Sequence, residues 1–367
     1  MELLATPSPT EPAPARTGGA PRAALPGLFV CVLVAMAADG ASLIASTHGM
    51  AMGALSIALV IGLGVGNLVP DTQGSTWSAG VAFAKRHVLR TGIVLYGFRL
   101  TLGDIESAGL RVVAIDVVTL ASTFALAVSV GVRLFKLDTP TAVLIGAGAS
   151  ICGTSAVLAT APIVGARAEH TCVAAATVAI FGTLAFLLYP LLHHGVAGWR
   201  GLPSGDAAFG TYIGSTVHEV AQVVATANAS GIAESSAVVA KMGRVALLAP
   251  FLLALALWQR RQQARAKSPE AEAIRGPDSP LSVMPWFALL FAAAVVINTV
   301  APVTDLRPTI QRMDTFALAV AMAGVGLATS LQAIRSAGAK PIALAGVVFL
   351  WLVVAGALIN SAVTALS

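Results

Sequence analysis

The residues best suited to chemistry lie in the stretch STVHEVAQVVATA, which is otherwise apolar. His218 and Glu219 are adjacent there, and Gln222 lies one helical turn beyond His218 on the same face. An ionisable pair inside an apolar segment indicates a functional site, because a buried charge in a membrane is costly. The pair could carry a proton in a coupled cycle. Alternatively, Glu219 forms a structural ion pair with Lys241 or Arg244. A zinc-protease motif is excluded, because a glutamine stands where the second histidine would be needed.

A second polar stretch lies within TAVLIGAGASICGTSAVLATA, residues 141–161, which is long and apolar enough to cross a bilayer. Its middle is rich in glycine and hydroxyl side chains, which weaken a helix and leave backbone groups in need of partners. We expect the helix to break around Ser150–Gly153 and to present N–H groups and hydroxyls to a solute. Close helix packing through small residues is the alternative. The expected solute contacts are Ser150, Ile151, Cys152, Gly153, Thr154 and Ser155.

Three basic side chains, one carboxyl group and one amide complete the set of candidates. Asp116 lies deep in another apolar stretch and is a second candidate for a proton carrier. Lys241 and Arg244 share a helix face, so they could attract an oxyanion or extend to the membrane surface. Arg99 has the same two interpretations. Asn67 follows the glycines of GLGVGN and could contact a solute, although helix packing also explains that motif.

Composition defines the class of protein. Hydrophobic residues make up 57% of the 367 residues and charged residues 11%, with a mean hydropathy of +0.85. Soluble domains carry about a quarter charged residues, so we expect a polytopic membrane protein. The net charge of +5 does not indicate nucleic-acid binding, because the basic residues fall in short loops between apolar segments. Neither a disulfide framework nor a metal site is indicated by the cysteines and histidines, and no cofactor is expected.

Apolar windows of about 20 residues predict eleven membrane-spanning helices. They cover approximately residues 27–47, 50–69, 82–101, 110–133, 139–163, 170–194, 208–229, 236–258, 283–302, 313–333 and 341–365. Most of the 22 Lys and Arg then fall on one side, which predicts a cytoplasmic N-terminus. Residues 1–26 are expected to form a disordered cytoplasmic tail, and residues 259–280 a cytoplasmic linker.

An odd number of spans suggests one extra helix, 27–47, and two inverted repeats of five, about 50–194 and 208–365. In that alignment the fifth span corresponds to the tenth, whose run AGVGLATS predicts a second broken helix. Further candidate solute contacts are then Gly324, Gly326, Thr329 and Ser330. Another internal similarity, GASICGTSAVLATA (148–161) with GSTVHEVAQVVATA (214–227), does not fit this alignment. Some of these matches must arise by chance, because alanine, glycine and valine dominate the composition.

Four sequence blocks carry a family resemblance, namely GAGASICGTSAV, STVHEVAQVVATA, KMGRVALLAP and RTGIVLYGFRLTL. From about residue 27 to the C-terminus, the chain resembles the YeiH-type bacterial membrane proteins, which carry a sulfate-exporter label. These are grouped with the cation:proton antiporter and anion transporter superfamily. The resemblance implies an all-helical, inverted-repeat fold with crossing broken helices. It brings no agreed site residues and says little about the substrate.

These features together predict a secondary transporter in the bacterial inner membrane that moves a small anion by alternating access. Sulfate or a sulfonate is the first choice. N-termini of half-helices at the fifth-span break, and at Gly324–Ser330, would bind the anion. Glu219 with His218 would couple transport to a proton or cation gradient, and Lys241 or Arg244 would raise the local potential. The expected partners are the anion, the ion gradient and the lipid bilayer, with no nucleic acid and with a homodimer left open.

Two alternatives remain at this stage. A cation:proton antiporter would bind its ion through Glu219 and Asp116. An intramembrane enzyme would use Cys152 or Ser150 with His218, and it would need that nucleophile within about 3 Å of the histidine. The sequence also leaves open whether the tenth span or the seventh faces the break in the fifth.

Overall fold

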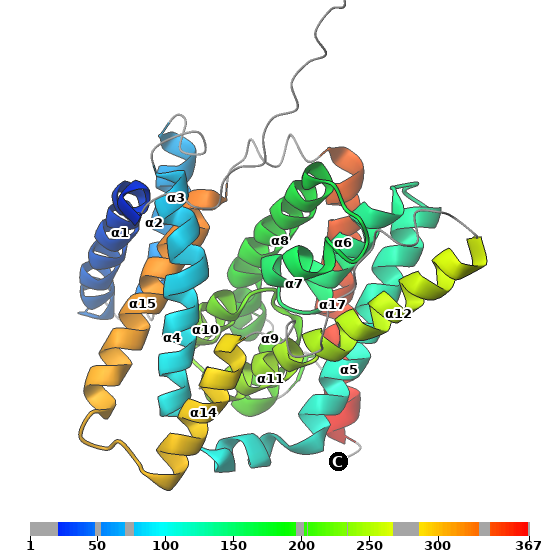
Figure 1. Cartoon of the computed structure of the whole chain (residues 1–367). Coiled ribbons are helices and arrows are strands. Elements are labelled where there is room, and N and C mark those ends of the chain that lie inside the picture. The colour runs from blue at the N-terminus through cyan, green and yellow to red at the C-terminus, as the bar shows by residue number, and fades with distance from the viewer. Residues whose placement is uncertain are drawn as a thin grey trace, which may run out of the picture.

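The computed structural model describes residues 21–47, 53–69, 77–195, 202–203, 205–232, 234–266, 286–329 and 338–365. The helices of this part of the chain form two groups that lie side by side (Figure 1). Lobe 1 contains α1 (Pro21–Thr47), α2 (Ala54–Leu68), α3 (Ser78–Phe83), η1 (Ala84–Val88), α4 (Leu89–Tyr96), η2 (Gly97–Arg99), α14 (Trp286–Val300) and α15 (Arg307–Ala328). Lobe 2 contains α5 (Leu102–Arg133), α6 (Thr139–Ser150), α7 (Thr154–Thr160), α8 (Ala168–Gly195), α9 (Asp206–Thr216), α10 (Val220–Ala229), α11 (Glu234–Ala246), α12 (Leu248–Ala266) and α17 (Ala339–Ala365).

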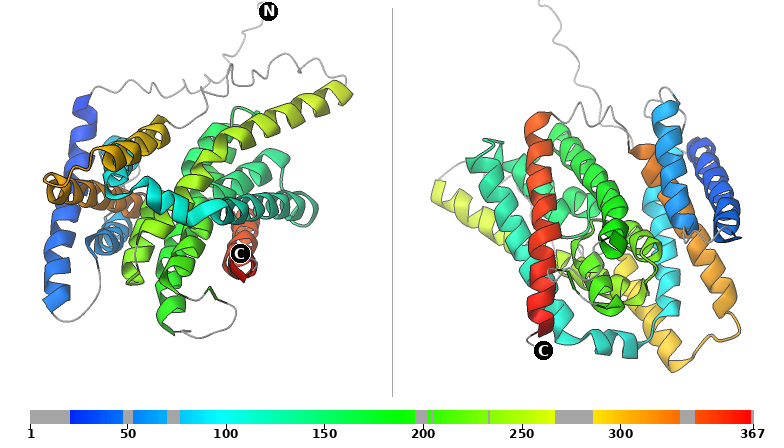
Figure 2. Two further views of the ribbon diagram at one scale, coloured as in Figure 1. Left: turned by 90° about the horizontal axis from the view of Figure 1, so that it is seen from below. Right: turned by 180° about the vertical axis from the view of Figure 1, so that it is seen from behind.

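The two lobes have separate interiors and a limited boundary. In lobe 1, α15 packs along α2 and α4, and α1 covers α2 and α3. In lobe 2, α5 packs on α6, α11 and α17, while α9 packs on α11 and α17. Helix α10 contacts α2 and α15 and so lies at the boundary between the lobes. The two lobes are also distinct in the view from behind (Figure 2).

Within the described residues, five helical stretches are long and apolar enough to cross a membrane, by length and composition. Their apolar parts are Ala24–Ile44, Gly109–Arg133, Glu169–His194, Glu234–Gln259 and Ala339–Ala365. The other apolar segments of the sequence form shorter helices or pairs of short helices. All eleven segments are thus helical over most of their described length, which confirms an all-helical protein in the part of the chain that the structure describes.

Several boundaries differ from those expected. Helix α1 begins at Pro21, before residue 27, and α12 continues to Ala266, so the first residues of the expected linker are helical. The expected tail up to residue 20 and the rest of the linker lie outside the described residues. Helix α5 begins at Leu102, where Thr101 and Asp104 form a capping box, but it is kinked at Gly109, which has φ +62°. Its apolar part, Gly109–Arg133, agrees with the expected span 110–133.

The tenth span ends within the stretch where a break is expected, because α15 runs from Arg307 to Ala328 and Thr329 is extended. Residues 330–337 lie outside the described ranges, so a second broken helix there stays a prediction. The glycines of α15 serve close packing. A Cβ atom on Gly326 would lie 2.4 Å from the carbonyl oxygen of Leu59 on α2, and one on Gly62 would lie 2.5 Å from that of Ala323. Glycines on both helices let the two backbones touch. The alignment of spans 2–6 with spans 7–11 as inverted repeats stays a prediction.

Candidate functional site

The fifth span is broken where the sequence predicted. Helix α6 ends at Ser150, and α7 begins at Thr154. Between them Gly153 has φ +71°, a conformation that L side chains rarely adopt. A Cβ atom on Gly153 would also lie 2.6 Å from Cγ of Glu219, so glycine is needed both for the turn and for the neighbour.

The seventh span is broken as well. Helix α9 ends at Thr216, Val217 and Glu219 are extended, and α10 begins at Val220. Glu219 is the N-cap residue of α10, where its side chain accepts from a backbone N–H while its own N–H donates to Oε1 of Gln222 at 3.2 Å. Thus Glu219 and Gln222 of the predicted motif cap the start of α10.

The two breaks fall at equivalent positions of two similar stretches of the sequence. When GASICGTSAVLATA is aligned with GSTVHEVAQVVATA, the interruption at 151–153 falls on the interruption at 217–219. Cys152 then corresponds to His218, and Gly153 to Glu219. The structure therefore gives physical meaning to this match, because among the described residues the break in the seventh span lies against the break in the fifth.

Two fully buried cations on α11 hold the breaks together. Nζ of Lys241 donates to the carbonyl oxygens of Ile151 at 2.7 Å and Val217 at 2.8 Å. Arg244 donates to the carbonyl oxygens of Ser150 at 2.8 Å and Ala149 at 3.0 Å, and to that of Ser215. These carbonyls belong to the ends of α6 and α9, where helices have unpaired acceptors and a partial negative charge. The cations thus satisfy both helix ends at once.

A carboxyl–hydroxyl contact links the breaks on their other side. Oγ1 of Thr154, the first residue of α7, donates to Oε1 of Glu219 at 2.9 Å. Glu219 is 9% exposed, whereas Thr154 and Ser155 are partly exposed. The crossing therefore offers hydroxyl groups at a boundary between the buried core and more open space.

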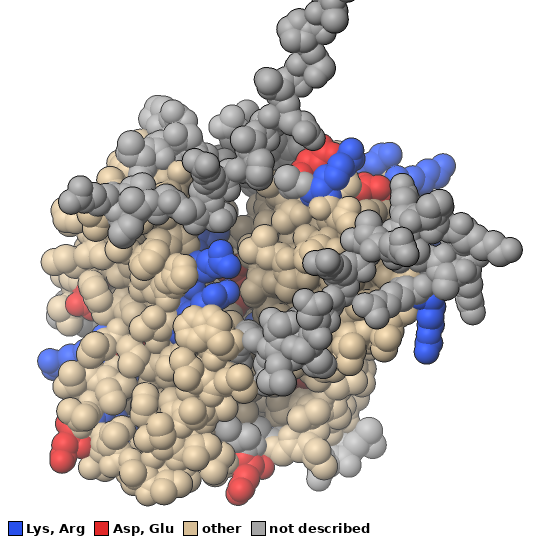
Figure 3. Space-filling view, in the orientation of Figure 1, with Lys and Arg blue, Asp and Glu red and all other residues tan. Residues whose placement is uncertain are grey.

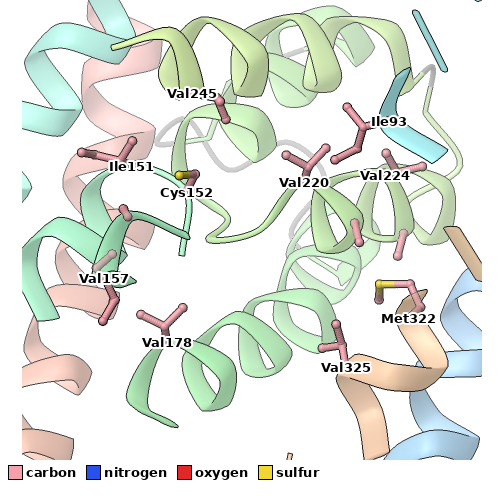
Figure 4. Close-up of a cluster of buried hydrophobic side chains, with 14 of the residues drawn as sticks. Ile93, Ile151, Cys152, Val157, Val178, Val220, Val224, Val245, Met322 and Val325 are labelled. Atoms are coloured by element: carbon pink, nitrogen blue, oxygen red, sulfur yellow. The ribbon is translucent and has the colours of Figure 1, made fainter. Parts of the chain in front are cut away.

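Apolar side chains seal the crossing against lobe 1. From α10, Val220 and Val224 project toward Ile93 of α4, and Met322 and Val325 of α15 lie beyond them (Figure 4). All five side chains are buried. The apolar face of α10 therefore lies between the crossing and lobe 1.

Several sequence candidates lie in lobe 1, away from the crossing. Nδ2 of Asn67 donates to the carbonyl oxygen of Leu63 at 2.8 Å and to that of Thr329 at 2.9 Å, which ties the end of α2 to the end of α15. Gly324 and Gly326 lie in the helix packing of lobe 1. Ser330 lies outside the described residues.

Arg99 forms a bridge between the lobes that the sequence did not predict. Its guanidinium lies 3.4 Å from Glu234 of α11, 3.5 Å from Asp314 of α15 and 4.5 Å from the ring centroid of Tyr96. The hydroxyl of Tyr96 donates to Glu234 at 3.2 Å. A pocket of about 370 Å³ adjoins this cluster and is also lined by Ser235, Arg307 and Gln311. The missed partners, Glu234 and Asp314, lie far from Arg99 in the sequence, so no local spacing signalled them.

The contacts that an enzyme would need differ from those observed. Sγ of Cys152 lies 2.9 Å from Oγ of Ser155. Oγ of Ser150 and Nδ1 of His218 are buried, and neither has a hydrogen-bond partner among the described residues. The nucleophile–histidine pairs of that hypothesis are therefore not joined through these atoms.

Fold and site together define a multi-pass helical membrane protein in which two broken helices cross inside one lobe. The comparisons agree with this class. A family model described as "Conserved hypothetical protein 698" matches residues 26–345. The chain is 44% identical over 349 residues to the "UPF0324 membrane protein PA5383" of Pseudomonas aeruginosa, covering 94% of this chain and 96% of that protein. It is also 44% identical over 339 residues to the "UPF0324 inner membrane protein YeiH" of Escherichia coli K12, covering 92% and 93%. No solved structure matches.

The chain belongs to this family of YeiH-type membrane proteins. The resemblance seen in the sequence blocks is thereby confirmed.

Proposed function

We propose that this chain is a secondary transporter of a small anion, with sulfate or a sulfonate as the first candidate, and that the anion binds where the two broken helices cross. The crossing itself carries the proposal, because it brings helix ends, hydroxyls and ionisable groups together in a buried core. Discontinuous helices of this kind form the solute sites of secondary transporters. The relatives' names say only that they are membrane proteins.

The ionisable groups favour an anion that travels with protons. Lys241 and Arg244 supply two positive charges, and Asp116 and Glu219, which lie in electrostatic range of Lys241, supply two negative charges. With all four groups charged the sum is zero. A proton on one carboxyl group would leave one excess positive charge, which a monovalent anion would balance, and sulfate would require a proton on each. A cation would instead add uncompensated positive charge, which disfavours the cation:proton antiporter.

Glu219 supplies a direct link between proton and anion. While its carboxylate is charged, it occupies the N-terminus of α10 and accepts a hydrogen bond from the hydroxyl of Thr154. The charged carboxylate thus fills the N-terminal end of α10 and uses the hydroxyl at the N-terminal end of α7, where the anion is expected to bind. A proton on Glu219 would remove that negative charge and release the hydroxyl of Thr154 as a donor for the anion.

Basic side chains of lobe 1 would draw an anion toward this site. Lys or Arg side chains gather on lobe 1 where it borders lobe 2 (Figure 3). Among the basic residues of η1 and α4, Arg90 has its guanidinium 5.5 Å from the ring centroid of Phe287 and lies in electrostatic range of Arg86 and Cys152. Clustered charge of one sign raises the local concentration of the opposite ion.

Alternating access would come from rocking of lobe 2 against lobe 1. The contact of Arg99 with Glu234 joins the lobes and would have to open in one half of the cycle. We place the chain in the bacterial inner membrane with eleven spans and a cytoplasmic N-terminus, following its basic loops. Within this arrangement the repeated elements are the breaks of the fifth and seventh spans.

Uptake of labelled sulfate into proteoliposomes, with and without a pH gradient, tests the proposal. Glu219→Gln keeps an oxygen acceptor for Thr154 but cannot change its charge. We expect it to reduce gradient-driven uptake about tenfold or more, while exchange of sulfate without a gradient continues. Unchanged gradient-driven uptake in this variant would show that Glu219 does not carry the proton. Uptake driven only by a sodium gradient would favour the cation-coupled alternative.

A further inference from the structure

One face of α5 carries a row of buried oxygen atoms without partners. Asp116, Thr119 and Thr123 are fully buried, and their spacing of three and four residues places them on one face of the helix. Both carboxyl oxygens of Asp116 and both threonine hydroxyls lack a hydrogen-bond partner among the residues that the structure describes. By contrast, the buried hydroxyl of Thr177 on α8 donates to the carbonyl oxygen of Ala174 at 2.8 Å.

The row continues onto α6 and reaches the break. A Cβ atom on Gly131 of α5 would meet Ala142 of α6, and one on Gly146 would meet Ala127, so the two helices run antiparallel in a fixed register. That register places Ser150 opposite Thr123. The hydroxyl oxygen of Ser150 is also buried and lacks a partner within the described ranges, although its carbonyl oxygen accepts from Arg244.

Five such atoms in one row indicate that something binds there. A buried polar atom without a hydrogen bond is costly, and the interior of a membrane protein offers no bulk water to satisfy it. A single metal ion does not fit, because seven residues of helix separate Asp116 from Thr123, a rise of about 10 Å. A cation is also disfavoured by Lys241 and Arg244, which are the charged side chains in electrostatic range of Asp116. Water fits, since it bonds to hydroxyl and carboxyl oxygens alike and typically fills such positions.

We propose that a row of internal water molecules lies along α5 from Asp116 to Ser150 and carries protons between Asp116 and the crossing of the broken helices. The charged groups that face Asp116 come from α11, namely Lys241 and Arg244. Helices α6 and α17, which pack on the same helix, bring the uncharged Ser150 and Asn360 to this region. The hydration stands on the geometry alone, whereas the movement of protons rests on the proposed transport function.

Thermal melting of the detergent-purified chain tests the hydration without reference to transport. The double variant Thr119→Val/Thr123→Val keeps the side-chain shape and removes two hydroxyls that would bind water. The control is Thr177→Val, which removes a buried hydroxyl that already has a protein partner. If the row holds water, the double variant should melt roughly 3 °C or more below the control, because bound water loses its partners. If the row is dry, the double variant loses only unpaired hydroxyls and should melt at the same temperature as the control or above it. That result would overturn the proposal.

Proteoliposomes test the proton path, with labelled sulfate as the probe. We expect Thr119→Val/Thr123→Val to lower uptake driven by a pH gradient about tenfold while exchange without a gradient stays within about twofold. Gradient-driven uptake equal to that of the unmodified chain would refute the path even if the melting test supports bound water. If the unmodified chain moves no labelled sulfate or sulfonate, the transport function fails, and the melting comparison still decides the hydration.

Discussion

Lys241 of α11 donates hydrogen bonds to backbone carbonyls at both helix breaks, so Lys241→Met is the sharpest test of the site. Methionine has a similar length but no charge or donor. The change removes two hydrogen bonds from a charged group to helix-end carbonyls. Such bonds contribute about 1.5–3 kcal/mol each, so the gross loss is about 3–6 kcal/mol. Part of this is offset because a cation no longer has to be buried, which leaves a net loss of about 3 kcal/mol.

Thermal melting of the purified protein in detergent measures this loss. A change of about 3 kcal/mol corresponds to a drop of roughly 6–12 °C on the scale of medium-sized domains. Lys340→Met is the matched control, because Lys340 is exposed at the start of α17. If the two variants melt at the same temperature, Lys241 does not hold the breaks together, and the account of the crossing is wrong.

Two further predictions concern the contacts of lobe 1. Glu234→Gln weakens the bridge between the lobes while Arg99 keeps its contact with Asp314, so we expect the pocket beside it to open more often. A cysteine placed at Ser235 should then react several-fold faster with a membrane-impermeant thiol reagent, and an unchanged rate would contradict the role of the bridge. Gly326→Ala should lower the free energy of unfolding by about 1–3 kcal/mol, because a Cβ atom there overlaps the backbone of α2. Gly64→Ala, which meets no atom within 4 Å, is its control in the same melting assay, and equal melting would contradict the close packing.

Much of the fold could be predicted because long apolar segments have few stable alternatives to a helix in a membrane. The break near Ser150 was predictable for a related reason, since glycines and hydroxyls occur together there. Gly324 and Gly326 lie inside a helix, because glycine serves close packing as well as helix breaks. The hydroxyl residues of that run, Thr329 and Ser330, follow these glycines, and α15 ends directly before Thr329.

Other parts of the site depend on long-range contacts that no local pattern encodes. Arg99 pairs with residues of α11 and α15, and Lys241 with carbonyls of two different breaks. A carbonyl acceptor can belong to any residue type, so the sequence could not indicate which backbone atoms Lys241 and Arg244 would bind. The contacts of Lys241 and Arg244 with the helix ends therefore became visible only in the structure.

The two aligned breaks also explain why the site is asymmetric. Gly153 and Glu219 occupy equivalent positions in the similar stretches, and they touch, since a Cβ atom on Gly153 would lie 2.6 Å from Cγ of Glu219. A long side chain at position 153 would overlap the side chain of Glu219. Two carboxyl groups there would also repel each other. The crossing therefore accommodates one carboxyl group, and the glycine that breaks the fifth span is the residue that makes room for it.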